Sequence, residues 1–196
     1  MIHLVRHGRT AANAAGLLLG RLDPPLDDVG EGQASALAAV PALAAAERVI
    51  SSPLARCRAT AAAIAATAAV EVEIDDRLIE LDYGDFDGRP LTDVAPEMWA
   101  RWRADITFAP PRGESIADVG LRVRALMDEL VPGAVGADIV VVSHVSPIKA
   151  ALAWALGVGD EVAWRIRLDP ASMCRLAVVG GRPSVHAMNH VPAGLG

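Results

Sequence analysis

An almost wholly apolar run, DIVVVSH at residues 138–144, limits the possible folds more than any other stretch of this sequence. A strand with one face in water alternates apolar and polar residues, whereas a strand covered on both faces is apolar throughout. Strands of the second kind are typical of parallel sheets, because the crossover helices pack on both sides of the sheet. The run therefore predicts the central strand of an α/β fold with three layers, α/β/α, and a mostly parallel sheet.

Strand and helix patterns alternate along the rest of the chain, as such a fold requires. Further strands are expected at 2–6, at 48–52 and at 70–74, the last at a sheet edge because it alternates apolar with acidic residues. Two or three strands are expected in the tail, near 163–168, 173–179 and 184–188. Helices are expected at 28–43, after Ser52, near 96–106, after Ser115 and from Ser146 to Gly157.

Capping residues mark several helix ends. Asp27 or Asp28 is expected to cap the helix at 28–43, which Pro41 kinks or ends. Three serines are expected to cap later helices: Ser52, Ser115 and Ser146. The chain is expected to form one domain over residues 1–196, with a small lid or rim segment at about 82–114.

The composition argues against several classes of protein. The formal net charge is −6 and there is no basic tract to neutralise phosphates, so no nucleic-acid partner is expected. The alanine-rich stretches are too short and too weakly apolar to cross a membrane, and no signal peptide is visible, so a cytoplasmic location is expected. Cys57 and Cys174 are expected to be buried free thiols, since they form no metal-ligand pattern. The chain is expected to be a monomer, or a homodimer paired through the strand at 70–74.

Three of the expected parallel strands end in polar residues where a loop or helix follows. These residues are Arg6, His7 and Gly8 after the first strand, Ser52 and Arg56 after the second, and Ser143 and His144 after the central strand. In open α/β sheets, ligands bind in the crevice beyond the carboxyl ends of the strands. Two histidines and two arginines would converge there, beside helix N-termini whose free N–H groups favour anions. The arrangement suits a phosphate.

Each residue also has a plainer interpretation when it is taken alone. A strand end such as RHG is more often a surface turn, Arg56 can be a solvated helix residue in an ion pair, and His144 can be a core histidine bonded to a carbonyl. The repetition of such residues at three strand ends favours the phosphate site.

The same residues lie in motifs that follow one another along nearly the whole chain. The motifs are RHGRTAAN at 6–13, Gly20, GEGQA at 30–34, SSPLARCRATA at 51–61, LIELDYGDFDG at 78–88, PRGES at 111–115 and VVSHVSPIKA at 141–150. With these motifs the chain resembles the histidine phosphatase superfamily, also called phosphoglycerate-mutase-like.

The resemblance implies that His7 attacks phosphorus and becomes a phosphohistidine, a role for which neutral imidazole is a suitable nucleophile. Arg6 and Arg56 would bind the non-bridging oxygens with their planar donor groups. His144 would add a further donor, as the neutral ring or as imidazolium. Because phosphoryl transfer depends mostly on positioning and charge stabilisation, this set would suffice for the transfer step.

The resemblance also identifies Glu80 as the general acid for the leaving alkoxide and then as the base that activates water, with Asp82 as its nearest rival. One branch of the family carries an aspartate directly after the second histidine, where this chain has Val145, and this favours Glu80. Other positions that match phosphate-binding or loop-ordering positions of the family are Gly8, Thr10, Asn13, Gly20 and Val145.

The family contains phosphatases and mutases, and a shared fold does not choose between them. The segment at 89–112 is shorter than the insertion with which cofactor-dependent mutases protect their phosphohistidine, so hydrolysis of a small phosphomonoester, without metal or other cofactor, is expected. Resemblance to actinobacterial acid-phosphatase-like members points the same way. A cofactor-dependent phosphoglycerate mutase is the alternative, and a non-catalytic phosphate-binding regulatory module is a second one. Trp99 and Trp102 can stack on a substrate ring or cover the core.

Overall fold

The protein is described by a computed structural model that covers residues 1–192, and it is built around one six-stranded sheet. The strands are β1 (Ile2–Arg6), β2 (Arg48–Ser51), β3 (Val72–Ile74), β4 (Ile139–Ser143), β5 (Met173–Val179) and β6 (Arg182–His190). Their order is β3-β2-β4-β1-β5-β6, with β1 to β4 parallel and β5 and β6 antiparallel to their neighbours. The predicted mostly parallel sheet is therefore confirmed, with β4 central and β3 at an edge.

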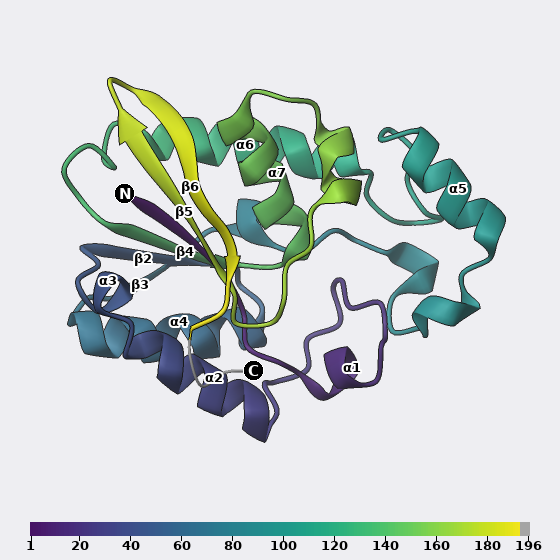
Figure 1. The fold of residues 1–196 in the computed structure, drawn as a ribbon. Helices are drawn as coiled ribbons and strands as arrows, with labels where there is room; N and C mark the ends of the chain where they lie inside the picture. Colours follow the sequence, from purple (N-terminus) through teal and green to yellow (C-terminus); the bar gives the residue numbers. More distant parts are fainter. Residues whose placement is uncertain (193–196) are drawn as a thin grey trace.

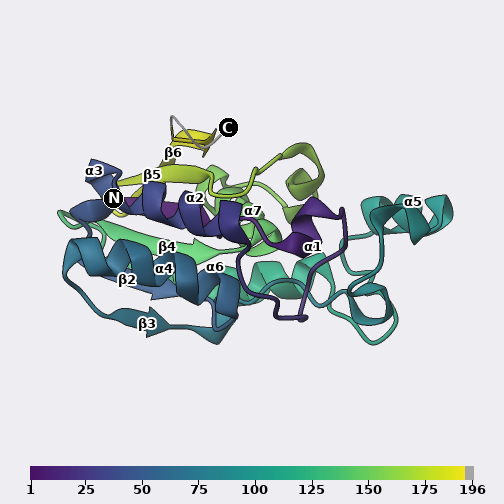
Figure 2. The same cartoon turned by 90° about the horizontal axis from the view of Figure 1, so that it is seen from below.

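Helices cover both faces of this sheet (Figures 1 and 2). The helices are α1 (Ala11–Ala14), α2 (Asp28–Ala38), α3 (Pro41–Ala44), α4 (Ala55–Ala68), α5 (Pro96–Ala104), α6 (Ile116–Leu130) and α7 (Val145–Leu156). Figure 1 shows α2, α3 and α4 on one side of the sheet and α6 and α7 on the other, so the predicted three layers are present. None of the helices in the described residues is long and apolar enough to cross a membrane.

The apolar run of β4 fills two cores at once. Ile139 and Val141 belong to a cluster that includes the inner residues of α6 and α7, whereas Val140 and Val142 belong to a cluster with α2 and α4. Successive side chains of a strand point to opposite faces, so both sets must be apolar. Full burial of one such side chain stabilises the fold by about 1.5–3 kcal/mol, which explains why a polar residue is absent until Ser143.

One predicted strand is wrong. Residues near 163–168 form no strand; they continue from a 3₁₀ helix, η4 (Asp160–Arg165). The pattern misled because Trp164 and Ile166, two residues apart, pack against the core beside α7 without pairing to a strand. Asp160 anchors this segment, since its buried carboxylate forms an ion pair with Arg124.

Two of the four predicted N-terminal helix caps are confirmed. Asp27 caps α2 and Ser115 caps α6, as expected, and Gly157 ends α7 in a left-handed conformation. The helix predicted at 28–43 is split, since α2 ends at Ala38 and Pro41 begins α3.

The predictions for Ser52 and Ser146 are wrong. The N-cap residues of α4 and α7 are Leu54 and His144, and neither makes a side-chain capping bond. A carboxylate from another segment takes that place in each helix: Asp23 Oδ1 accepts from Ala55 N at 2.7 Å, and Glu80 accepts from the first residues of α7. Both N-termini therefore already bind negative charge, as their dipoles favour.

Residues 82–114 lie past the carboxyl ends of the parallel strands. They contain two 3₁₀ turns, η2 (Gly84–Phe86) and η3 (Leu91–Asp93), and the helix α5. Figure 2 shows α5 standing beyond the end of β4. This segment is thus placed where it borders anything bound at the strand ends.

Candidate active site

The two motif histidines meet where β1 and β4 end side by side. Arg6 is paired in register with Ser143, and the next residue, His7, donates its N–H to the Ser143 carbonyl at 3.1 Å. The ring centroids of His7 and His144 lie 5.1 Å apart at an interplanar angle of 64°. The predicted convergence of strand ends is confirmed, because β2, β4 and β1 are parallel neighbours.

One hydrogen bond fixes the state of the His7 ring. His7 Nδ1 lies 2.7 Å from the carbonyl oxygen of Gly8, and a carbonyl can only accept, so we assign the proton to Nδ1. The lone pair is then at Nε2, which forms no hydrogen bond within the described residues. Burial, followed by the positive charges of Arg6 and Arg56, holds the pKa of His7 well below its usual range. His7 is thus a neutral imidazole with a free nucleophilic nitrogen.

His144 is also buried, and it faces a hydroxyl and a thiol. Its Nε2 lies 2.7 Å from Ser52 Oγ and 3.3 Å from Cys57 Sγ. Burial, then the proximity of His7 and Arg56, places the pKa of His144 well below its usual range. Of the two forms that the sequence left open, this environment favours the neutral ring.

The strand-end pattern places Ser52 with the converging polar residues, although only a capping role is predicted for it. Ser52 reaches His144 because β2 lies next to the strand that carries His144. The contact of Cys57 with His144 has no signal in the sequence. Cys57 and Cys174 are both buried free thiols, as predicted.

The two arginines are held by backbone carbonyls. Arg56 is completely buried, and its Nη1 and Nη2 donate to the carbonyls of Leu22 and Gly20 at 2.8 and 2.9 Å. Arg6 Nη1 donates to the Leu168 carbonyl at 2.7 Å. The Nε atoms of Arg6 and Arg56 are buried and have no hydrogen-bond partner within residues 1–192. A buried donor without a partner is costly, so an anion that accepts from these groups would bind favourably.

Glu80 is fixed at the N-terminus of α7. Its Oε2 accepts from Val145 N at 3.0 Å, and its Oε1 accepts from Ser146 N at 3.1 Å and from Leu81 N at 2.7 Å. The side chain is only 3% exposed, and it lies close enough to Arg6 and Arg56 to influence both guanidinium groups. Asp82, its expected rival, instead accepts from Gly84 N at 2.8 Å within its own turn.

An ion pair holds the backbone that carries Glu80. Arg122 Nε and Nη2 donate to the two carboxylate oxygens of Glu114 at 2.9 and 3.0 Å. Arg122 also donates to the carbonyls of Arg77 and Glu80, and Glu114 accepts from Asp82 N at 3.4 Å. Glu114 of the PRGES motif thus links Arg122 of α6 to the backbone next to Glu80, although Glu114 does not contact Glu80 itself.

The smaller motif residues shape the loop after β1. Thr10 and Asn13 form a capping box at the start of α1, so both side chains are occupied with the backbone of their own helix. At Gly8 a Cβ atom would lie 2.5 Å from the carbonyl oxygen of Gly30, so glycine is required by close packing of two backbones. Gly20 supplies a carbonyl to Arg56 and an N–H to Asp87 Oδ1 at 2.7 Å. These contacts assign all four residues to holding the loop.

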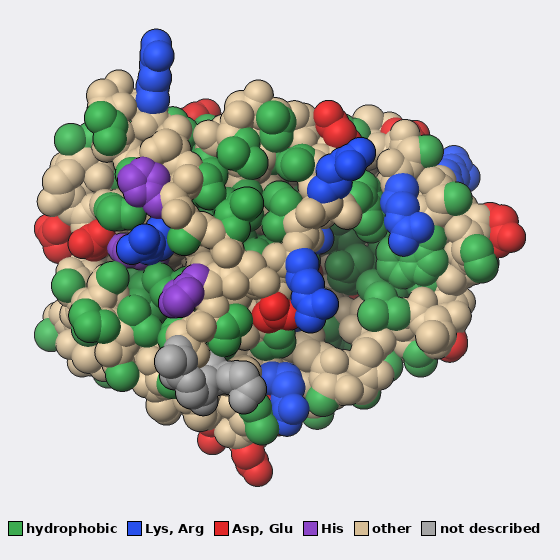
Figure 3. Space-filling model, in the orientation of Figure 1, with side chains coloured by type: hydrophobic (Ala, Val, Ile, Leu, Met, Phe, Trp, Pro, Cys, Tyr) green, Lys and Arg blue, Asp and Glu red, His purple; other side chains and the backbone are tan. Residues whose placement is uncertain are grey.

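The described residues contain no group of three or more His, Cys, Asp or Glu side chains arranged to hold a metal ion. Figure 3 shows a hollow on the right-hand side of the molecule, between basic side chains and with hydrophobic side chains inside it.

Comparison with known proteins identifies the family of the chain. The family model described as "Histidine phosphatase superfamily (branch 1)" matches residues 2–191. A bifunctional protein of Mycobacterium tuberculosis is 41% identical over 177 residues, which are 87% of this chain and 48% of that protein. The chain thus spans about half the length of that relative. A probable phosphoglycerate mutase of Yersinia enterocolitica is 34% identical over 180 residues, 89% of this chain and 83% of that protein.

Among solved structures, a mycobacterial glucosyl-3-phosphoglycerate phosphatase in complex with VO3 is 30% identical with a TM-score of 0.86, over 96% of this chain and 98% of that one. The family match covers nearly the whole described chain and includes the two histidines, the two arginines and Glu80. The chain belongs to branch 1 of the histidine phosphatase superfamily.

Proposed function

We propose that this chain hydrolyses small phosphomonoesters, without a metal ion or other cofactor, through a phosphohistidine formed on His7. The observation that carries the proposal is the His7 ring, which the Gly8 carbonyl holds with Nε2 free, near two guanidinium groups whose buried Nε donors lack partners in the described residues. Such a pocket presents a nucleophile and fixed positive charge to the same phosphoryl group.

The proposed reaction has two steps. The phosphate dianion of the substrate favours uptake of a proton by Glu80. His7 Nε2 attacks phosphorus, the P–O bond to the alcohol breaks, and the protonated Glu80 donates its proton to the leaving oxygen. The ionised Glu80 then accepts a proton from water as the water oxygen attacks phosphorus and the P–N bond breaks. Inorganic phosphate and neutral His7 result, with Glu80 protonated again. Arg6, Arg56 and His144 stabilise the charge on the non-bridging oxygens in both steps.

Hydrolysis is favoured over mutase activity by the segment that borders the site. Residues 82–114 provide one nine-residue helix, α5, and two short turns, and we propose that they form a rim which leaves water access to the phosphohistidine. The relatives include proteins named for either activity, so they do not separate the two.

The test is release of inorganic phosphate from phenyl phosphate, 3-phosphoglycerate and sugar phosphates, with chelator present. We expect the wild type to release phosphate and His7→Ala to lose it. His186→Ala is the matched control, because His186 is exposed on β6 and belongs to none of the site residues. If chelator stopped phosphate release by the wild type, the proposal that hydrolysis needs no metal ion would be wrong. Isomerisation of 3-phosphoglycerate without release, in an assay primed with the bisphosphate, would establish the mutase instead.

A further inference from the structure

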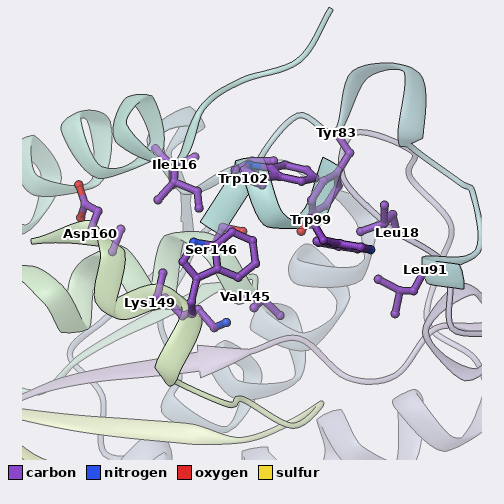
Figure 4. Close-up of a pocket in the computed structure, with 15 residues that line it drawn as sticks. Leu18, Tyr83, Leu91, Trp99, Trp102, Ile116, Val145, Ser146, Lys149 and Asp160 are labelled. Carbon is purple, nitrogen blue, oxygen red and sulfur yellow. The ribbon is translucent and has the colours of Figure 1, made fainter. Parts of the chain in front are cut away.

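A cavity of about 160 Å³ lies between α5, α7 and η4, next to the site (Figure 4). Its walls are mainly apolar and include four aromatic side chains. Trp99 and Trp102 are stacked with ring centroids 5.6 Å apart, and Trp164 stands nearly perpendicular to Trp99 at 6.3 Å. Tyr83 packs edge-on against Trp102 at 5.7 Å. The cavity therefore offers flat apolar surfaces to whatever enters it.

The cavity begins where the proposed acid is held. Val145 and Ser146 line it, and their N–H groups are the ones that bind the Glu80 carboxylate. Lys149, one helical turn further along α7, also lines it and lies within the electrostatic influence of Glu80 and Arg6. An alcohol group that receives a proton from Glu80 would therefore extend into this cavity.

Three of the side chains that line the cavity carry donors with no partner in the described residues. Lys149 is the only lysine of the chain, is half-buried, and forms no hydrogen bond or ion pair within the described residues. The indole Nε1 atoms of Trp102 and Trp164 are buried and also lack a partner there. Asp160, the acidic residue lining the cavity, is paired with Arg124 and does not neutralise Lys149. Burial lowers the pKa of Lys149, as expected for an ammonium without a partner.

We propose that this cavity binds the leaving group of the substrate, and that this group is aromatic and carries one carboxylate that pairs with Lys149. The proposal rests on the proposed phosphatase function and names its substrate class. The aromatic walls fit a planar ring, and the indole N–H groups can donate to a carboxylate that the ammonium holds. The one ammonium that lines the cavity matches one carboxylate, because buried charges are stable only when they are paired.

A purely structural role explains only part of the cluster. Trp102 is 1% exposed and covers the core whatever else it does. Core covering gives no reason for an unpaired ammonium among tryptophans, since a methionine at position 149 would pack there at a lower cost of desolvation. The carboxylate partner supplies that reason.

The first test compares two esters that differ by one carboxylate. We expect wild-type kcat/KM to be higher for 3-carboxyphenyl phosphate than for phenyl phosphate, and Lys149→Met to lower that preference about 10- to 100-fold, as for loss of a hydrogen bond to a charged group. Lys149→Arg should keep part of it. Arg175→Met, which removes an exposed charge on β5, should keep all of it. Equal kcat/KM for the two esters in the wild type, or equal losses on both in Lys149→Met, would overturn the proposal.

The second test does not depend on turnover. Three of the four tryptophans line the cavity, so 3-hydroxybenzoate, the alcohol product of the carboxylated ester, should change the intrinsic fluorescence on binding. Binding by the wild type that weakens at least about 10-fold in Lys149→Met, while phenol binds both alike, supports the cavity assignment even if no phosphate is ever released. Absence of binding in a wild type that hydrolyses phenyl phosphate would overturn the cavity assignment and leave the phosphatase function standing.

Discussion

The backbone carbonyl of Gly8 sets the orientation and the tautomer of the His7 ring. The Gly8 oxygen accepts from His7 Nδ1, and this leaves Nε2 as the lone-pair nitrogen. An imidazole that is both neutral and held in one tautomer needs no proton loss before attack. The residue identities that make this possible, His7 and Gly8, are readable from the sequence, whereas the direction of the ring is not.

His7 is expected to stay neutral at pH 5.5, since burial and the two arginines lower its pKa. The measurement is the ¹⁵N chemical shift of the His7 ring, with Nδ1 protonated and Nε2 bare from pH 7.5 to 5.5. The same protein unfolded in urea supplies the control, because an exposed histidine titrates near pH 6.5. Protonation of the folded His7 ring above pH 6 would contradict this assignment.

Glu80→Gln is expected to slow hydrolysis of alkyl phosphates about 10²- to 10⁴-fold, since the amide cannot supply a proton to a poor leaving group. An activated aryl phosphate needs less protonation and should lose much less in kcat/KM for its phosphorylation step. Asp82→Asn is the matched control, because Asp82 caps its own turn at Gly84 N. Equal losses on both substrates would refute the role of Glu80 as an acid.

Among the helices and strands, the features that depend on residues close together in the sequence were predicted best. The Ser115 cap, the apolar run of β4 and the stop at Gly157 follow from short-range patterns. The starts of α4 and α7 were misplaced because their capping partners, Asp23 and Glu80, come from distant segments that only the folded chain brings near.

The capping box of α6 gives a local test of stability. Ser115 Oγ accepts from Asp118 N at 3.1 Å and the Asp118 side chain accepts from Ser115 N at 3.1 Å. Ser115→Ala should therefore lower the free energy of unfolding by about 1 kcal/mol. Urea unfolding measures it, with Ser35→Ala, an exposed serine within α2, as the control. A change equal to that of the control would show that the cap contributes nothing.

Glu114 is expected to act as a positioning residue. Glu114→Gln weakens the ion pair with Arg122 that holds the Glu80 segment, so kcat should fall several-fold with KM changed less. The leaving-group dependence should then move toward that of Glu80→Gln, which a general loss of stability would not produce. An unchanged leaving-group dependence would contradict the positioning role.

At the level of the whole molecule, the family was predictable because its motifs follow in order along the chain. The three layers were predictable because one strand is apolar on both faces. The cavity beside Glu80 was not predictable, since its lining comes from seven separate stretches between Leu18 and Trp164. Hydrophobic periodicity reports only on residues close together along the chain, so it does not show that these stretches meet. Lys149 lies in the last of the family motifs, but nothing in the motif predicts a role for it.

Stability should depend on pH on both sides of neutrality. Burial lowers the pKa of His3, His7 and His144, so below about pH 6.5 the unfolded state binds more protons than the folded state. The free energy of unfolding therefore decreases as the pH is lowered from 6.5. Each group contributes at most about 1.4 kcal/mol per pH unit. Burial raises the pKa of Cys57 and Tyr83, so stability also falls above about pH 9. Urea unfolding at pH 5.5, 7.5 and 9.5 checks this, and equal stability at 5.5 and 7.5 would contradict it.

The most direct test of phosphoryl transfer to His7 is to trap the phosphoryl-enzyme. Rapid quenching of wild type with a phosphomonoester, followed by ³¹P NMR and peptide mapping under alkaline conditions, locates the phosphoryl group. We expect an acid-labile phosphohistidine at Nε2 of His7, absent in His7→Ala and accumulating in Glu80→Gln with an aryl phosphate. A phosphoryl group on Nδ1 of His7, on His144, or on no residue during active turnover would contradict it.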